Sequence, residues 1–150
     1  MQNAEYRKAL VDWVNERTSW THFITLTTKF PMTVQAMRLE VERFIRRLTA
    51  STQGPVYNLW VLEKSSFGHP HVHMVAQLGA AMTAGHIASK WAAGGTRFTK
   101  RQLGRTDIQP YDDALRGVAY ITKTLPSEDA EWGLCLPRQF DDLSVASLSA

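Results

Sequence analysis

Two histidines and one glutamate have the types and spacing that could bind a metal ion. His71 and His73 flank a single valine in HVHMV, a pattern typical of a β-strand, so both imidazoles should project from one face of that strand. Glu63 ends the preceding predicted strand, and in an antiparallel hairpin the end of one strand lies beside the start of the next. Imidazole and carboxylate ligands together suit divalent cations such as Mn²⁺ or Mg²⁺. The H-x-H pattern alone is also compatible with ordinary surface histidines.

Tyr120 and Lys123 form a second pair with chemical potential, in the segment DALRGVAYITK. Helical spacing places them on one face, and Arg116, four residues before Tyr120, is predicted to share that face. The apolar residues of the segment are predicted to face the core: Leu115, Val118 and Ile121. Neighbouring positive charge favours the nucleophilic phenolate and can also hold a phosphate group. The residues therefore favour phosphoryl transfer, although an ordinary amphipathic helix with a half-buried tyrosine fits them as well.

The elements that must position these residues alternate between helical and strand patterns. We expect helices at about 4–16, 33–48, 83–92 and 112–124, and strands within THFITLTT (21–28) and at 56–63, 71–78 and 106–109. The middle of this order is β-α-β-β-α-β, the ferredoxin-like arrangement. The predicted fold class is therefore α+β, with an antiparallel sheet and helices packed against one of its faces.

Composition narrows the class of protein. The 150 residues suit one domain, and 44% hydrophobic with 21% charged residues is normal for a soluble globular chain. No stretch approaches the about 18 apolar residues that span a bilayer, and the polar segment 1–17 lacks the apolar core of a signal peptide. The single cysteine, Cys135, excludes an internal disulfide framework and a thiolate zinc cluster. We therefore expect a cytoplasmic protein that does not bind a membrane.

Three motifs occur in an order that resembles the HUH endonucleases. They are FITLTT (23–28), HPHVHMV (69–75) and YITK (120–123). The chain looks most similar to the catalytic domain of single-tyrosine rolling-circle replication initiators, the Rep proteins of plasmids, phages and small circular DNA viruses. The resemblance covers about 21–125. It implies a single HUH endonuclease domain over 1–150, with a ferredoxin-like or RRM-like core at about 21–125 and a C-terminal extension at 127–150.

The resemblance also implies a role for each matching residue. His71 and His73 match the metal-binding pair of the family, and Glu63 stands where its third ligand is usual. Tyr120 matches the nucleophile, and Lys123 matches the lysine that accompanies it. The implied enzyme is a metal-dependent DNA endonuclease and strand transferase that uses Mn²⁺ or Mg²⁺. It would nick single-stranded DNA through a 5′-phosphotyrosine intermediate, release a 3′-hydroxyl, rejoin strands without ATP, and so initiate rolling-circle replication.

The implied partner is single-stranded or hairpin origin DNA, with host replication machinery as a further partner and a monomer or weak dimer as the assembly. The net charge is only +3, so DNA contacts are expected from local groups of residues. The candidates are Thr25, Thr27, Arg97, Lys100, Arg101, Arg105 and Arg116. Trp60 and Trp91 would either pack in the core or stack on bases. The compartment would be the cytoplasm for a bacterial plasmid or phage protein, and the nucleus for a protein of a eukaryotic virus.

Two other functions fit parts of the same pattern. A single-tyrosine HUH transposase would use the same residues on hairpin-ended DNA, typically as a dimer. A non-catalytic, RRM-like nucleic-acid-binding module would share the fold but needs aromatic residues at central strand positions, where the third strand carries His71 and His73 instead.

Overall fold

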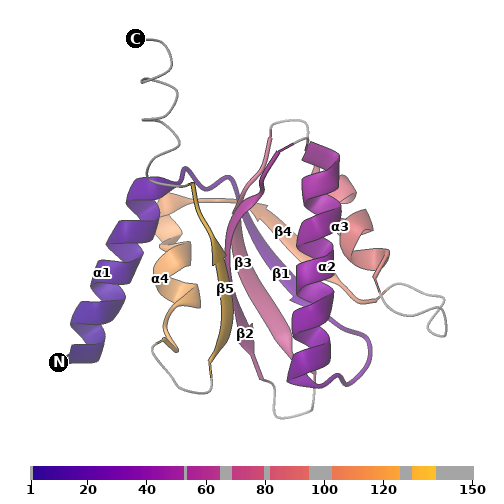
Figure 1. The fold of residues 1–150 in the computed structure, drawn as a ribbon, viewed down its shortest axis with the longest axis horizontal. Helices are drawn as coiled ribbons and strands as arrows, with labels where there is room; N and C mark the ends of the chain where they lie inside the picture. Colours follow the sequence, from indigo (N-terminus) through magenta and orange to yellow (C-terminus); the bar gives the residue numbers. More distant parts are fainter. Residues whose placement is uncertain are drawn as a thin grey trace, which may run out of the picture.

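A computed structural model describes residues 2–52, 54–64, 69–79, 82–94, 103–125 and 130–137. Figure 1 shows the chain as one open sheet flanked by helices. The elements are α1 (Gln2–Arg17), β1 (His22–Thr27), α2 (Val34–Thr52), β2 (Tyr57–Glu63), β3 (His71–Gln77), α3 (Ala84–Ala92), β4 (Thr106–Pro110), the 3₁₀ helix η1 (Asp113–Leu115), α4 (Gly117–Ile121) and β5 (Glu131–Cys135). No described helix has the length and apolar character needed to cross a membrane.

The sheet is fully antiparallel, and its strand order is β4-β1-β3-β2-β5. Strands β1 to β4 with α2 and α3 reproduce the predicted β-α-β-β-α-β order, so the α+β, ferredoxin-like expectation is confirmed. The central strand β3 pairs with β1 on one side and with β2 on the other. This arrangement is compatible with the HUH endonuclease fold.

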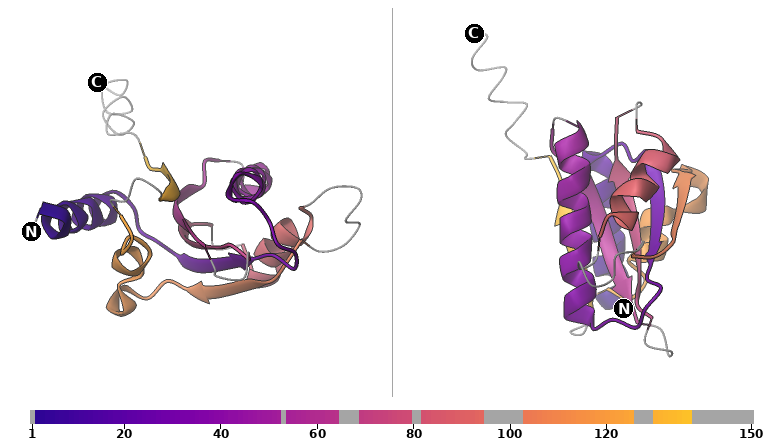
Figure 2. Two further views of the ribbon diagram at one scale, coloured as in Figure 1. Left: turned by 90° about the horizontal axis from the view of Figure 1, so that it is seen from below. Right: turned by 90° about the vertical axis from the view of Figure 1, so that its right-hand side faces the viewer.

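Helices cover both faces of the sheet, which corrects the prediction of a single covered face. Helices α2 and α3 pack on one face, and α1 and α4 pack on the other, as the views in Figures 1 and 2 show. The pattern of β2 reflects this, since five consecutive residues of that strand are buried. A strand buried on both faces loses its alternation of polar and apolar residues, so the second helical layer leaves little trace in the sequence.

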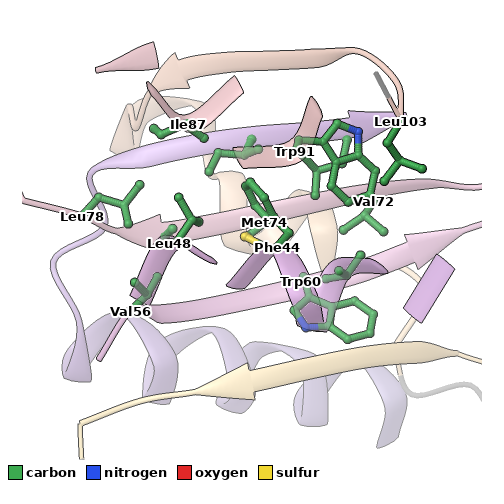
Figure 3. Packing of buried hydrophobic residues seen from close by; sticks show 14 of the residues in the cluster. Phe44, Leu48, Val56, Trp60, Val72, Met74, Leu78, Ile87, Trp91 and Leu103 are labelled. Carbon is green, nitrogen blue, oxygen red and sulfur yellow. The ribbon is translucent and has the colours of Figure 1, made fainter. Parts of the chain in front are cut away.

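The larger core lies between the sheet and the helices α2 and α3 (Figure 3). Phe44 and Trp91 meet edge to face there, with ring centroids 5.6 Å apart. The Trp91 indole N–H donates to the main-chain carbonyl of Thr27 at 2.9 Å. Trp60 and Trp91 are both buried, so they belong to the core and are not exposed for base stacking.

Strand β5 was missed by sequence analysis, which left the region after residue 126 without elements. It extends the sheet by pairing with β2, with Trp60 opposite Gly133. A Cβ at Gly133 would lie 2.3 Å from the indole Nε1 of Trp60, so only glycine lets β5 pass this close to the ring. The pairing depends on this long-range fit, which no local pattern predicts.

The predicted continuous helix at 112–124 is wrong, because Arg116 breaks it. Arg116 has φ 50° and ψ 51°, in the left-handed region that non-glycine residues rarely adopt. The break separates η1 from α4 and leaves Leu115 72% exposed, although helical spacing had placed this residue in the core. Val118 and Ile121 are buried as predicted.

Tight packing at Gly117 gives a physical reason for the break. A Cβ at this position would lie 2.8 Å from Cε2 of Tyr111 and 3.0 Å from Cδ2 of Phe23. The backbone at Gly117 therefore approaches two aromatic rings directly, and the chain turns at Arg116 to bring it there. The carboxylate of Asp112 accepts a hydrogen bond from the Ala114 N–H at 2.9 Å and caps the separate turn η1.

Candidate active site

The hairpin of β2 and β3 brings Glu63, His71 and His73 together on the sheet face that α4 covers. Glu63 pairs with His71 across the hairpin, and His73 lies two residues further along the same face. Glu63 Oε2 is 3.0 Å from His71 Nε2 and 3.5 Å from His73 Nε2. One ligand atom from each residue can be chosen so that all three lie within 4.8 Å of one another. The three residues thus form a possible metal-binding cluster, as the strand spacing predicted.

The ionisation of these groups suits a cation. Burial raises the pKa of Glu63, but the contacts with Lys123, His71 and His73 outweigh burial and hold it below its usual value. Burial lowers the pKa of His73 despite the nearby Glu63 carboxylate. An ionised carboxylate and a neutral imidazole are the forms that bind metals.

The donor atoms also fit a divalent ion in number and kind. Two imidazole nitrogens and one carboxylate would leave further coordination positions for oxygen atoms of a substrate or of water. The second carboxylate oxygen, Glu63 Oε1, is buried and makes no well-directed hydrogen bond, although Lys123 Nζ lies 3.0 Å away as an ion pair. A buried oxygen with unused acceptor capacity is a suitable metal ligand.

Thr25 supports the cluster from β1. It lies opposite His73 in the sheet, and its Oγ1 is 3.2 Å from His73 Nδ1. If Nδ1 carries the proton and donates it to this hydroxyl, Nε2 is left with the lone pair that faces Glu63. Hydrogen bonds of this kind fix the orientation of metal-binding histidines. Sequence analysis had named Thr25 only as a candidate DNA contact.

Thr25→Val is expected to weaken Mn²⁺ binding by about tenfold or more, because outer-shell partners of metal ligands typically contribute 10- to 100-fold in affinity. Valine keeps the branched shape that suits β1 and removes only the hydroxyl. Calorimetric titration with Mn²⁺ measures the effect. Thr27→Val is the matched control, since the Thr27 hydroxyl donates to the main-chain carbonyl of Arg105 and not to a histidine. Equal Mn²⁺ affinities for the two variants would contradict this role of Thr25.

Tyr120 lies directly beside this cluster. Its ring stands edge to face with the His73 ring, with centroids 5.5 Å apart, and Phe23 lies 6.4 Å away on the other side. The Tyr120 side chain is 48% exposed, so a substrate can reach it. A half-exposed phenol next to a metal-binding cluster is well placed to attack a phosphate held there.

Lys123 connects the tyrosine to the carboxylate. Its Nζ lies 3.0 Å from Glu63 Oε1 and 4.2 Å from the centroid of the Tyr120 ring. The hydrogen bond to Glu63 is the largest cause of the raised pKa of Lys123, and Tyr120 contributes to it as well. The predicted pairing of Tyr120 with Lys123 on one side of α4 is therefore present in the structure.

The structure does not bring Arg116 to the same place. Arg116 is exposed and lines a groove of about 1080 Å³ between α1 and α4, whereas Tyr120 lines a separate hollow next to Phe23. The expectation that Arg116 shares the face of Tyr120 is wrong, because it assumed an unbroken helix. Lys123 alone supplies positive charge to the phenol among the two cations proposed from the sequence.

The other candidate DNA contacts are only partly described. Arg105 is exposed just before β4, and its carbonyl accepts from the backbone N–H of Thr27 at 2.9 Å. Thr27 lies opposite His71 in the sheet, so its side chain is on the face of the metal-binding cluster. Arg97, Lys100 and Arg101 lie outside the described residues.

Helix α1 contacts the site region in a way that sequence analysis did not identify. Arg7 Nη1 donates a hydrogen bond to the main-chain carbonyl of Lys123 at 3.1 Å. Val14 packs with Val118 and Ile121 in the second core. The predicted apolar stripe of α1 is wrong in part, since Tyr6 and Trp13 are exposed. The two partners Arg7 and Lys123 are 116 residues apart, so no local pattern could indicate their contact.

Comparison with known proteins gives one family match. The family model described as replication-associated protein, of the ORF2 type, matches residues 21–126. The matched range begins just before β1 and includes Glu63, His71, His73, Tyr120 and Lys123. Helix α1 and strand β5 lie outside it. Neither the curated proteins nor the solved structures gave a match.

Proposed function

Because this chain belongs to the ORF2-type family of replication-associated proteins, we propose that it initiates DNA replication by cutting one DNA strand and joining itself to the cut end. The family links the chain to replication and to DNA. The proposed activity is that of a sequence-specific, single-stranded DNA endonuclease and strand transferase of the rolling-circle type. One observation carries the proposal: the Tyr120 ring lies 5.5 Å from the ring of His73, which belongs to the metal-binding cluster.

In the proposed cutting step, the phenolic oxygen of Tyr120 attacks the scissile phosphorus. A new bond forms between phosphorus and the phenolic oxygen, and the bond between phosphorus and the 3′ oxygen of the preceding nucleotide breaks. The phenol loses its proton to solvent, and the departing oxygen gains one to become a 3′-hydroxyl. The phosphodiester energy is conserved in the 5′-phosphotyrosine link. A later 3′-hydroxyl can therefore reverse the reaction and close a strand without ATP.

The chain's own residues prepare this reaction. Glu63, His71 and His73 would hold Mn²⁺ or Mg²⁺, which when bound supplies positive charge that stabilises a phosphate under attack. Thr25 keeps His73 oriented toward the cluster. Lys123, with its ammonium between Glu63 and the Tyr120 ring, is placed to hold the phosphate and offset its developing charge.

We extend the proposal to the DNA path and to the domain. Single-stranded or hairpin DNA would cross the face that carries the cluster, and Thr27 and Arg105 lie at the edge of that face, beside β1 and β4. The catalytic unit would be one domain with a core at about 21–125, to which residues 127–150 are an extension.

The proposal is tested by incubating the protein with a diverse pool of single-stranded oligonucleotides and Mn²⁺, followed by a denaturing gel. We expect a band that contains both protein and DNA and that disappears when EDTA is added first. Peptide mapping should place the DNA on Tyr120 and not on the other three tyrosines, which are Tyr6, Tyr57 and Tyr111. Sequencing the attached strand gives the cut site. Binding of DNA without any adduct would favour a non-catalytic module and overturn the proposed activity.

A further inference from the structure

A small hollow lies beside Tyr120, on the side away from the metal-binding cluster. The ring of Tyr120 forms one side, and its other walls include Phe23, Tyr111 and Leu115. Its volume is about 170 Å³. All of its lining residues belong to the described part of the chain. The proposed chemistry at Tyr120 gives this hollow no role.

The hollow results from the break in the chain at Arg116. The turn η1 directs Leu115 away from the core, so that this leucine is 72% exposed. The glycine at position 117 leaves the rings of Tyr111 and Phe23 in direct contact with the backbone. The backbone N–H of Tyr111 is held by the carbonyl of Thr21 at 2.9 Å, which fixes this residue after β4. Aromatic rings and a leucine side chain are thereby left open to solvent beside the nucleophile.

Size and lining together restrict what the hollow can hold. Pockets for drug-sized molecules usually exceed about 300 Å³, so this volume suits a single flat ring system and not a whole nucleotide. Aromatic walls favour stacking with a flat ring. Gln109 and Asp112 also line the hollow and offer hydrogen-bonding groups for the edge of such a ring.

We propose that this hollow holds the nucleobase of the nucleotide whose 5′ phosphate Tyr120 attacks. The inference rests on the proposed function and adds the position of one base to it. That phosphate becomes bonded to a residue of the hollow's own wall, so its nucleotide stays within reach of the hollow before and after cutting. Held in this way, the attached 5′ end keeps the orientation that the rejoining step needs.

The test uses the strand identified from the oligonucleotide pool and replaces each base near the cut site, one at a time, by an abasic sugar. Rates of adduct formation are then measured under single-turnover conditions. Loss of one stacked base should slow the reaction by about tenfold or more at the position directly 3′ of the cut. The same series is repeated with Leu115→Ala, which removes one wall of the hollow and, because Leu115 is exposed, leaves the folded core intact.

The two changes should not act independently, because they disrupt the same contact. In Leu115→Ala the intact strand should react about fivefold more slowly, and the penalty for the abasic sugar 3′ of the cut should shrink by a similar factor. Leu39→Ala is the matched control, since Leu39 is also an exposed leucine, at 49%, but belongs to α2 on the opposite face. This control should react like the original protein with every strand.

An equal abasic penalty in the original protein and in Leu115→Ala would overturn the inference, as would a profile with no loss at that position. Failure of the original protein to form any adduct with the intact strand would overturn the proposed function, and this inference with it. The intact-strand reaction therefore distinguishes the two failures.

Discussion

Tyr120→Phe is expected to abolish the covalent link between protein and DNA while leaving DNA binding and Mn²⁺ binding nearly unchanged. Deleting a covalent nucleophile should reduce the rate by a factor on the order of 10⁴ or more. Phenylalanine keeps the ring, and with it the edge-to-face contact with His73 and the position of Lys123 over the ring. Tyr120 is half exposed, so its loss of a hydroxyl should change the free energy of unfolding by less than about 0.5 kcal/mol.

The measurement compares adduct formation on a denaturing gel with DNA affinity in a filter or polarisation assay. Tyr6→Phe is a matched control, because Tyr6 is 50% exposed, close to the 48% of Tyr120, and lies on α1. This control should form adduct at the original rate. An adduct that persists in Tyr120→Phe, at a rate close to the original, would show that another residue is the nucleophile.

The second large effect is expected from Glu63→Gln. The substitution keeps the shape of the side chain but removes the negative charge that lies between His71, His73 and Lys123. Mn²⁺ affinity should fall by about a hundredfold or more, because loss of a direct ligand should exceed the 10- to 100-fold effect of outer-shell partners. Since an ion that binds only the folded state raises its melting temperature, the stabilisation by Mn²⁺ should largely disappear in this variant.

Thermal melting with and without Mn²⁺ measures this effect directly. Glu131→Gln serves as the control, since Glu131 is a partly buried carboxylate on the neighbouring strand β5 that pairs with Arg38 at 2.8 Å. It should keep the full increase in melting temperature on addition of Mn²⁺. If Glu63→Gln kept it too, the metal would bind elsewhere in the protein.

The metal-binding cluster could be predicted from the sequence because its geometry is local. A spacing of two residues places His71 and His73 on one face of any strand, and a short hairpin places Glu63 beside them. The position of Tyr120 could not be derived in this way. It followed from the resemblance between motifs, since residues in a helix and in a sheet meet only through tertiary packing.

The errors occurred where close packing overrides periodicity. The segment at 113–123 has good helical spacing, yet the direct contact of Gly117 with Tyr111 and Phe23 requires a break at Arg116. The second helical layer and β5 also depend on long-range contacts, such as the fit of Gly133 against Trp60. Neither contact produces a repeating pattern along the chain.

The short length of α4 divides the site into parts of unequal rigidity. The cation ligands stand on β2 and β3 inside the sheet, whereas the nucleophile belongs to a helix of five residues, too short to be stable alone. That helix keeps its place through the packing of α1 and the bond from Arg7 to the Lys123 carbonyl. Such an element opens at lower cost than the strands. A loaded tyrosine can thus swing aside for an incoming 3′ end while the ligands stay still, with α1 acting as the hinge stop that limits its travel.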